Sequence, residues 1–240
     1  MCIARDRGGP LNSPDMVRLV LFDIDGTLVH TGGAGVKAFG QVFANEFSAH
    51  DGIERLKFAG RTDVSLVREF FSLHGIPATS ANFERFFERY VHLLHHILGQ
   101  SKTEECPGVR ALITDLQTLP EPPLLGLLTG NVRLGAEIKL RHFGLWDHFE
   151  TGGFADDHEE RDQIAAVAKQ RSERVLGRKL AGQEIIVIGD TPLDIRCGRA
   201  IGAKVLAVAT GGSRYEELEA HKPDWVVEDV RDLRAADLCG

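Results

Sequence analysis

The feature that most constrains the fold of this chain is a repeated alternation of short apolar runs with segments of helical periodicity. Four continuous apolar runs end in small or acidic residues: "RLVLFDID" (18–25), "LLGLLTGN" (124–131), "EIIVIGDT" (184–191) and "KVLAVATG" (204–211). Such runs are typical of strands that are buried on both faces of a parallel sheet. Helical patterns lie between and after them, at 107–119, 132–142, 158–176, 192–200 and 214–220. The alternation predicts an α/β fold with a doubly wound parallel sheet.

Two further segments are weaker strand candidates. They are "HFETGGF" (148–154) and "DWVVEDV" (224–230), and the second would form a final edge strand. Pro107 and Pro192 stand near the starts of two predicted helices, where the missing N–H of proline does no harm.

Residues 31–105 interrupt the alternation. This stretch contains three patterns with apolar residues at i, i+3 and i+4: "GVKAFGQVFANEF", "TDVSLVREFFSLHGI" and "ANFERFFERYVHLLHHIL". We therefore expect an inserted α-helical cap domain at 31–105. The α/β core would comprise residues 17–30 and 106–240, and residues 1–16 would form a flexible N-terminal tail.

Composition narrows the possible partners and compartments. The net charge of −7 argues against a general nucleic-acid-binding surface. No apolar run approaches the roughly 18–20 residues that span a bilayer. The four cysteines are scattered and form no C-x-x-C pair, a usage that favours free thiols in a reducing compartment. We expect a cytoplasmic protein with neither a nucleic-acid nor a membrane partner, and the oligomeric state stays open.

Polar residues follow the strongest predicted strands at the points where those strands end. They are Asp23, Asp25, Thr129, Asn131, Asp190 and Asp194. Because ligands of open parallel sheets bind outside the carboxyl ends of the strands, these side chains should converge on one crevice. Carboxylates so close together raise one another's pKa unless a cation neutralises them. Oxygen ligands select a hard cation, so the pattern predicts a Mg²⁺ site.

Three motifs give the chain a resemblance to a known family. "DIDGTLV", "LLTGN" and "GDTPLDI" resemble motifs one, two and four of the haloacid dehalogenase-like hydrolases, in the same order and with similar spacing. The resemblance extends from about residue 17 onward, and the helical insert is similar to the cap of the phosphoglycolate-phosphatase-like branch. It implies a Mg²⁺-dependent phosphatase that acts on a small phosphorylated metabolite.

Two other functions stay open beside the phosphatase. A phosphomutase built on the same core would share the two aspartates of "DIDGT". A non-catalytic binding protein is a third possibility, but such a protein would usually have lost the nucleophile or a metal carboxylate, and Asp23, Asp25 and Asp190 are all present.

The resemblance also implies roles for individual residues. Asp23 would be the nucleophile that forms an aspartyl-phosphate, and Asp25 would be the general acid and base. The Asp23 carboxylate, the Asp25 backbone carbonyl and Asp190 would ligate Mg²⁺. Asp194 would stand behind them and orient either the metal's water ligands or a basic residue.

The phosphoryl group would be held by the second motif. Thr129 and the backbone N–H groups of Gly130 and Asn131 would bind the phosphoryl oxygens at a helix N-terminus. The third motif of the family usually supplies a lysine, but the matching segment "GGFADDHEERDQI" has none. We expect Arg161 in that position, because arginine also grips phosphate and keeps its charge; Lys139 and Lys169 are alternatives.

The segment "GRTD" (60–63) in the predicted cap resembles a substrate-facing loop of the same branch. Arg61 could there bind a carboxylate or phosphate of the substrate. Alternatively, the segment is an ordinary helix start at which Thr62 or Asp63 caps the helix that follows.

Overall fold

The computed structural model describes residues 16–239, so that most of the predicted N-terminal tail lies outside the described residues. Within this range six strands form one sheet, in which every pairing is parallel and the order is β5-β4-β1-β6-β7-β8. The strands are β1 (Leu19–Phe22), β4 (Leu124–Leu128), β5 (Thr151–Gly153), β6 (Ile185–Gly189), β7 (Lys204–Val208) and β8 (Trp225–Val227). The predicted α/β fold with a parallel sheet is confirmed.

The register places the ends of the three central strands side by side. Phe22, the last residue of β1, pairs with Leu127 of β4 and with Ile188 of β6. The Asp23 N–H continues this pairing by donating to the Ile188 carbonyl at 2.9 Å. The polar residues that follow β1, β4 and β6 therefore emerge together at one edge of the sheet.

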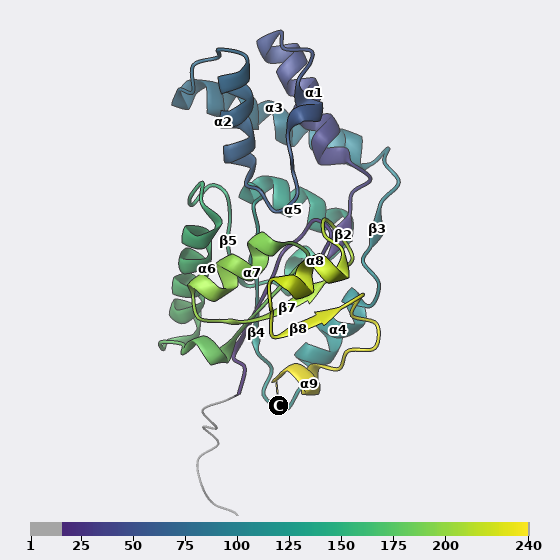
Figure 1. The fold of residues 1–240 in the computed structure, drawn as a ribbon, viewed down its shortest axis with the longest axis vertical. Coiled ribbons are helices and arrows are strands. Elements are labelled where there is room, and N and C mark those ends of the chain that lie inside the picture. Colours follow the sequence, from purple (N-terminus) through teal and green to yellow (C-terminus); the bar gives the residue numbers. More distant parts are fainter. Residues whose placement is uncertain (1–15, 240) are drawn as a thin grey trace, which may run out of the picture.

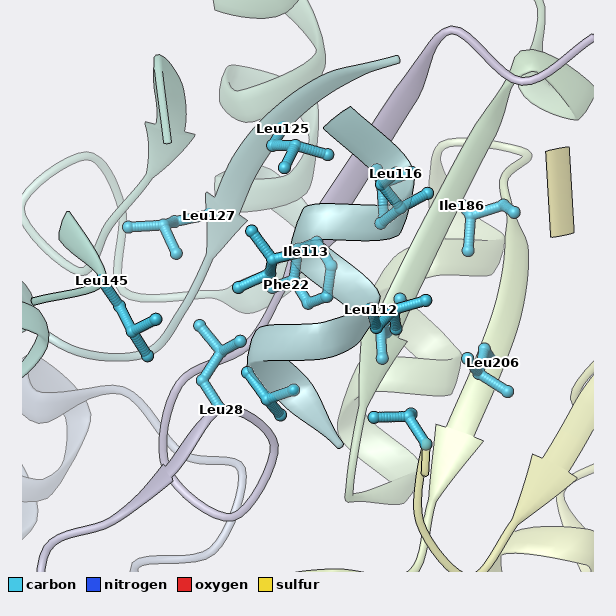
Figure 2. Packing of buried hydrophobic residues seen from close by; sticks show 14 of the residues in the cluster. Phe22, Leu28, Leu112, Ile113, Leu116, Leu125, Leu127, Leu145, Ile186 and Leu206 are labelled. Atoms are coloured by element: carbon cyan, nitrogen blue, oxygen red, sulfur yellow. The ribbon is translucent and has the colours of Figure 1, made fainter. Parts of the chain in front are cut away.

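Helices cover both faces of the sheet, because successive strand residues point to opposite sides. Val20 and Phe22 pack into one apolar cluster, and Leu19 and Leu21 pack into another. The first face is covered by α4 (Val109–Gln117), α5 (Arg133–His142) and α9 (Ala235–Cys239). The second is covered by α6 (Arg161–Leu176), α7 (Pro192–Ala200) and α8 (Tyr215–Ala220). Figure 2 shows the first cluster, where Leu112, Ile113 and Leu116 of α4 lie over Phe22 and its neighbours.

The segment that interrupts the alternation forms three helices: α1 (Ala34–Phe47), α2 (Asp63–Leu73) and α3 (Ser80–Leu98). We call the segment from Ala34 to Leu98 the cap. It lies beyond one end of the sheet (Figure 1), and its helices build an apolar cluster that also includes Val132 and Ala155 of the core. Aromatic rings dominate that cluster, and the rings of Phe43 and Phe70 stack with centroids 3.6 Å apart. The three predicted helices are confirmed, whereas the domain boundaries 31–105 stay a prediction.

Two short strands join the cap to the core. β2 (Val29–His30) leads into the cap, β3 (Glu104–Glu105) leads out of it, and the two pair antiparallel with Val29 opposite Glu105. Figure 1 shows both strands between the cap and the sheet. Three single turns of 3₁₀ helix complete the described elements: η1 (Ile53–Arg55), η2 (Trp146–His148) and η3 (Gly182–Glu184).

Two observations bear on the expected surroundings of the protein. Between residues 16 and 239, no helix combines the length and the apolar character that crossing a membrane requires. Cys106, Cys197 and Cys239 are buried as free thiols. The cytoplasmic location stays a prediction.

Candidate active site

A cavity of about 330 Å³ lies between the cap and the carboxyl ends of the central strands. Its core side is lined by Asp23, Asp25, Asn131, Lys139, Arg161 and Asp190. The cap contributes mainly apolar side chains, among them Phe39, Phe58 and Tyr90. The cavity is therefore charged at its floor and mainly apolar on the cap side, where Arg61 and Asp63 are the charged residues.

Three buried carboxylates form the centre of this floor. Asp23, Asp190 and Asp194 each offer a carboxylate oxygen, and these oxygens lie within 4.8 Å of one another. The two carboxylates predicted to ligate Mg²⁺, those of Asp23 and Asp190, are thus side by side. Asp194 joins them, and the Asp25 carboxylate, for which only the backbone carbonyl was predicted as a ligand, is not part of this cluster.

Burial disfavours the ionised form of these carboxyl groups. Desolvation raises the pKa of Asp23 to about 7; Arg161 opposes the shift, and Asp194 and Asp25 add to it. Desolvation also raises the pKa of Asp190 well above its ordinary value, with further contributions from Asp194 and Asp23. A divalent cation would offset this cost, and a set of carboxylate oxygens is the donor set that Mg²⁺ prefers. The residues present therefore fit the expected metal.

Glycines and a threonine hold Asp190 in place. Its Oδ1 accepts a hydrogen bond from Thr27 at 3.1 Å, and its Oδ2 accepts one from the Gly212 N–H. A Cβ atom on Gly26 would lie 2.6 Å from Asp190 Oδ2, and Gly26 also has a φ of 84° that other residues avoid. A Cβ atom on Gly211 would collide with the same oxygen.

The contributions of Thr27, Gly211 and Gly212 were missed by sequence reasoning. A signal was available for the glycines, since they directly follow the run "KVLAVAT", whose strand ends at the same edge of the sheet.

Arg161 is the cation next to Asp23. It is the first residue of α6 and is buried. Its guanidinium Nη2 lies 3.4 Å from Asp23 Oδ1 and hydrogen-bonds to Asp194 Oδ1. Lys169, one of the two alternatives, instead points its ammonium at the Ile201 carbonyl, 3.4 Å away and outside the cavity.

Both carboxylate oxygens of Asp194 accept hydrogen bonds from neighbouring residues. Oδ1 binds Arg161, and Oδ2 accepts the N–H of Thr191 at 3.0 Å and its hydroxyl at 2.6 Å. The Thr191 contacts place Asp194 in the first turn of α7, where a carboxylate is favoured by the backbone N–H groups. Asp194 thus contacts the basic residue, one of the two arrangements that the sequence left open.

Asp25 has a different set of partners. Its Oδ2 accepts hydrogen bonds from the Lys139 ammonium at 2.5 Å and from the Asn131 side-chain amide at 2.8 Å. The same amide nitrogen lies 2.9 Å from the Thr129 hydroxyl oxygen, and the Asn131 carbonyl accepts a bond from Lys139. Lys139 therefore does not share the position of Arg161, because each cation serves a different aspartate.

The cap meets the core at Gly130. The Asp63 N–H donates to the Gly130 carbonyl at 2.7 Å, and the Asp63 carboxylate accepts the Val132 N–H at 2.8 Å. A Cβ atom on Gly130 would collide with the Arg61 carbonyl. Burial raises the pKa of Asp63 to about 7, although Lys139 and the Val132 N–H act in the opposite direction.

The "GRTD" segment begins helix α2, which is the second of the two alternatives given for it. Thr62 is the N-cap of α2, and its hydroxyl oxygen accepts the Ser65 N–H at 3.2 Å. Arg61 lines the cavity, but its guanidinium pairs with Glu69 and lies 3.3 Å from the Ser65 hydroxyl. Its binding of substrate stays a prediction.

Comparison with known proteins identifies the family. The family model described as haloacid dehalogenase-like hydrolase matches residues 20–208. The chain belongs to this family, as the motifs around Asp23, Thr129 and Asp190 predicted.

Named relatives span almost the whole chain. Pyrophosphatase PpaX from Bacillus pumilus is 27% identical over 227 residues, which cover 91% of this chain and 95% of the relative. A phosphoglycolate phosphatase from Chromobacterium violaceum is 28% identical over 229 residues, covering 90% of this chain and 95% of the relative. The crystal structure of CbbY from Rhodobacter sphaeroides in complex with phosphate shares the fold. Its TM-score is 0.73 at 18% identity, and the match covers 93% of this chain and 99% of that one.

Proposed function

We propose that this protein is a Mg²⁺-dependent phosphatase that hydrolyses a small phosphomonoester through an aspartyl-phosphate on Asp23. The observation that carries the proposal is the pairing of the two aspartates of "DIDGT" with separate cations on one cavity floor. Asp23 lies beside Arg161, and Asp25 beside Lys139. One carboxylate is thus available to attack phosphorus and the other to move a proton.

The first half-reaction transfers the phosphoryl group to the enzyme. A carboxylate oxygen of Asp23 forms the new bond to phosphorus while the bond from phosphorus to the ester oxygen breaks. Asp25 gives its proton to that leaving oxygen. In the second half-reaction water attacks the phosphorus and gives a proton to Asp25, while the bond from phosphorus to the Asp23 oxygen breaks. Inorganic phosphate leaves, and both carboxyl groups are restored.

The second motif supplies donors for the phosphoryl oxygens. The Thr129 oxygen accepts its hydrogen bonds from Asn131, so its own O–H stays available as a donor. The backbone N–H groups of Gly130 and Asn131 precede α5, where the helix dipole favours an anion. Arg161 adds a full positive charge beside Asp23.

The Asp23 and Asp190 carboxylates and the Asp25 carbonyl would hold Mg²⁺. When bound, the ion would neutralise the phosphoryl oxygens and so lower the repulsion that the Asp23 carboxylate meets on approach. Asp194 holds Arg161 beside Asp23: one Asp194 oxygen accepts a hydrogen bond from Arg161, and the other accepts one from the Thr191 hydroxyl.

We expect a compact substrate, because the cap forms one side of a cavity of about 330 Å³ above the aspartates. The names of the relatives offer two candidates: phosphoglycolate, which is a phosphomonoester, and pyrophosphate, a phosphoanhydride whose phosphorus Asp23 would attack in the same way. A phosphomutase is the alternative, since Asp23 and Asp25 would serve it equally. Release of inorganic phosphate without a sugar bisphosphate activator would exclude the mutase.

The test is hydrolysis of p-nitrophenyl phosphate by the wild-type protein with Mg²⁺, by the same protein with EDTA, and by the Asp23→Asn variant. We expect activity only in the first case. Full activity of Asp23→Asn would overturn the mechanism. A panel of phosphorylated metabolites, including pyrophosphate and phosphoglycolate, would then identify the substrate by its kcat/KM.

A further inference from the structure

Lys139 is a buried cation that pairs with Asp25, and the two half-reactions of the proposed phosphatase give it no role in the proton transfer. It lies near the end of α5, and its side chain is 5% exposed, whereas that of its partner Asp25 is 43% exposed. Lysine is almost never buried to this degree unless it is paired. Both of its hydrogen-bond acceptors, Asp25 and Asn131, belong to segments that follow central strands of the sheet.

The two donors to Asp25 converge on a single oxygen. Lys139 Nζ lies 2.5 Å from Asp25 Oδ2, and Asn131 Nδ2 lies 2.8 Å from the same atom. Neither donor occupies Oδ1. The carboxylate is thereby held by one oxygen, and the other is left to exchange a proton with substrate or water.

The strength of this arrangement comes from charge and burial. Hydrogen bonds between an ammonium and a carboxylate are roughly twice as strong as those between neutral groups. Lys139 also binds the Asn131 carbonyl, and this bond orients the amide whose nitrogen reaches Asp25. One buried cation therefore sets the direction of both contacts to a carboxylate that is otherwise open to the cavity.

We infer that Lys139 is a positioning residue for proton transfer by Asp25. It holds Asp25 Oδ2 so that Oδ1 can deliver a proton to the leaving oxygen as the electron pair of the phosphorus–oxygen bond moves to that oxygen. Lys139 itself neither gains nor loses a proton. The inference rests on the proposed function, and it adds that Lys139 orients the Asp25 carboxyl group for the proton transfer.

The leaving group of the substrate provides the test. An alkyl phosphate needs a proton on its leaving oxygen, whereas p-nitrophenolate leaves as an anion. The ratio of kcat/KM for the two esters therefore reports protonation of the leaving group, and kcat/KM does so even when a later step limits kcat. Because general acid catalysis contributes about 100-fold or more, Lys139→Met should lower kcat/KM about 100-fold for ethyl phosphate and less than about 5-fold for p-nitrophenyl phosphate.

A double-mutant cycle shows whether Lys139 acts through Asp25. In the Asp25→Asn background, Lys139→Met should cause no further loss on ethyl phosphate, because the group that it positions is already gone. Equal losses on both esters, or a loss that persists in the Asp25→Asn background, would mean that Lys139 binds substrate directly or supports only the fold. Either result overturns the inference.

Controls separate this inference from misfolding and from the proposed function. Lys169→Met removes a lysine whose ammonium faces a backbone carbonyl outside the cavity, so the ratio between the two esters should stay that of the wild type. If Lys139→Met fails to fold, as judged by circular dichroism, Lys139→Gln retains an uncharged N–H donor and should show the same preference with smaller losses. Full activity of Asp23→Asn would overturn both proposals, whereas an Asp23-dependent enzyme with equal losses would overturn only the role of Lys139.

Discussion

The Asp63 carboxylate accepts the backbone N–H of Val132 at 2.8 Å, so a side chain of the cap closes the N-terminus of a helix of the core. The N-cap residue Val132 forms no side-chain capping hydrogen bond. Asp63, which is the first residue of α2, supplies the acceptor instead. The free N–H groups at the start of a helix need such an acceptor. This hydrogen bond joins the cap to the N-terminus of α5, beside the bond from the Asp63 N–H to the Gly130 carbonyl.

The stability of the protein should depend on the ionisation of Asp63. Its pKa is about 7 in the folded protein because of burial, against an ordinary value of 3.8. Between these pH values the folded state keeps a proton that the unfolded state has lost, so this group destabilises the fold as pH rises. Relative to Asp63→Asn, the wild type should lose up to about 1.4 kcal/mol of unfolding free energy per pH unit in that window.

Urea unfolding of both proteins at pH 5 and pH 8 measures this difference. Other groups titrate in both proteins, so subtraction isolates Asp63. The groups that act on it electrostatically are Lys139, Asp25 and Asp156, and all three are retained. Parallel pH dependences of the two proteins would contradict the prediction.

Substitution of Gly130 should disturb the contact between the cap and the core. A Cβ atom there would collide with the Arg61 carbonyl and lie 3.1 Å from Thr62 Cα, and both neighbours are backbone atoms. The cap must therefore shift in Gly130→Ala. Because small displacements of a substrate-binding group can cost about 100-fold, we expect kcat/KM to fall by about that factor.

The matched control is Gly40→Ala on α1, where the nearest atom to the new Cβ is Ile53 Cγ1 at 3.9 Å. This variant should keep wild-type kcat/KM, and it should be more stable by about 0.5–1 kcal/mol because alanine is the better helix residue. Equal kinetics of the two alanine variants would show that closure of the cap does not depend on this contact.

Replacement of Arg161 should affect both stability and activity. Arg161→Met leaves Asp23 and Asp194 buried without their cation, and breaking a buried pair in this way costs about 3–5 kcal/mol. Arg161→Lys keeps the charge and should recover part of the stability and of the phosphatase activity. Thermal unfolding and kcat/KM for p-nitrophenyl phosphate measure both effects, and a stable, active Arg161→Met would refute the role of this residue.

Mg²⁺ should stabilise the folded protein through Asp190. A ligand that binds only the folded state adds about 2.7 kcal/mol at 100 times its Kd, so the Tm of the wild type should rise with MgCl₂. Asp190→Asn should be at least as stable as the wild type without metal, because it removes one charge from a buried acidic cluster. Its Tm should not respond to MgCl₂, whereas the exposed control Glu219→Gln should respond like the wild type.

The pattern of apolar residues was sufficient to predict the sheet and most of the helices. β1, β4, β6 and β7 lie within the four apolar runs, and α7 spans 192–200 as expected. β2 and β3 were not predicted, because two-residue strands carry no periodicity and their pairing joins residues about 75 positions apart. α9 was also missed, since five residues are too few to show a helical repeat.

Part of the candidate site could likewise be predicted from the sequence, and part could not. Asp23, Thr129 and Asp190 could be predicted to converge, because each follows a strand and the ends of parallel strands meet at one edge. The hydrogen-bond and ion-pair partners of the site residues could not be predicted. Lys139 lies eight residues beyond Asn131, and only the direction of α5 decides that its ammonium reaches Asp25 rather than Asp23. The capping of α5 by Asp63 likewise depends on how the cap packs against the core.

The paired strands β2 and β3 make the sheet independent of what lies between them. The chain leaves the core at His30 and returns at Glu104, which pairs with His30. With respect to the core, the whole segment between them is therefore a loop whose two ends lie side by side. The entropy of closing such a loop changes only slowly with its length, by about 0.6 kcal/mol for each doubling. A longer, shorter or differently folded insertion could occupy this point without altering the strand order. The sheet and the fold of its cover can therefore diverge separately in evolution or in design, as long as the cover keeps its contacts with Gly130 and Val132.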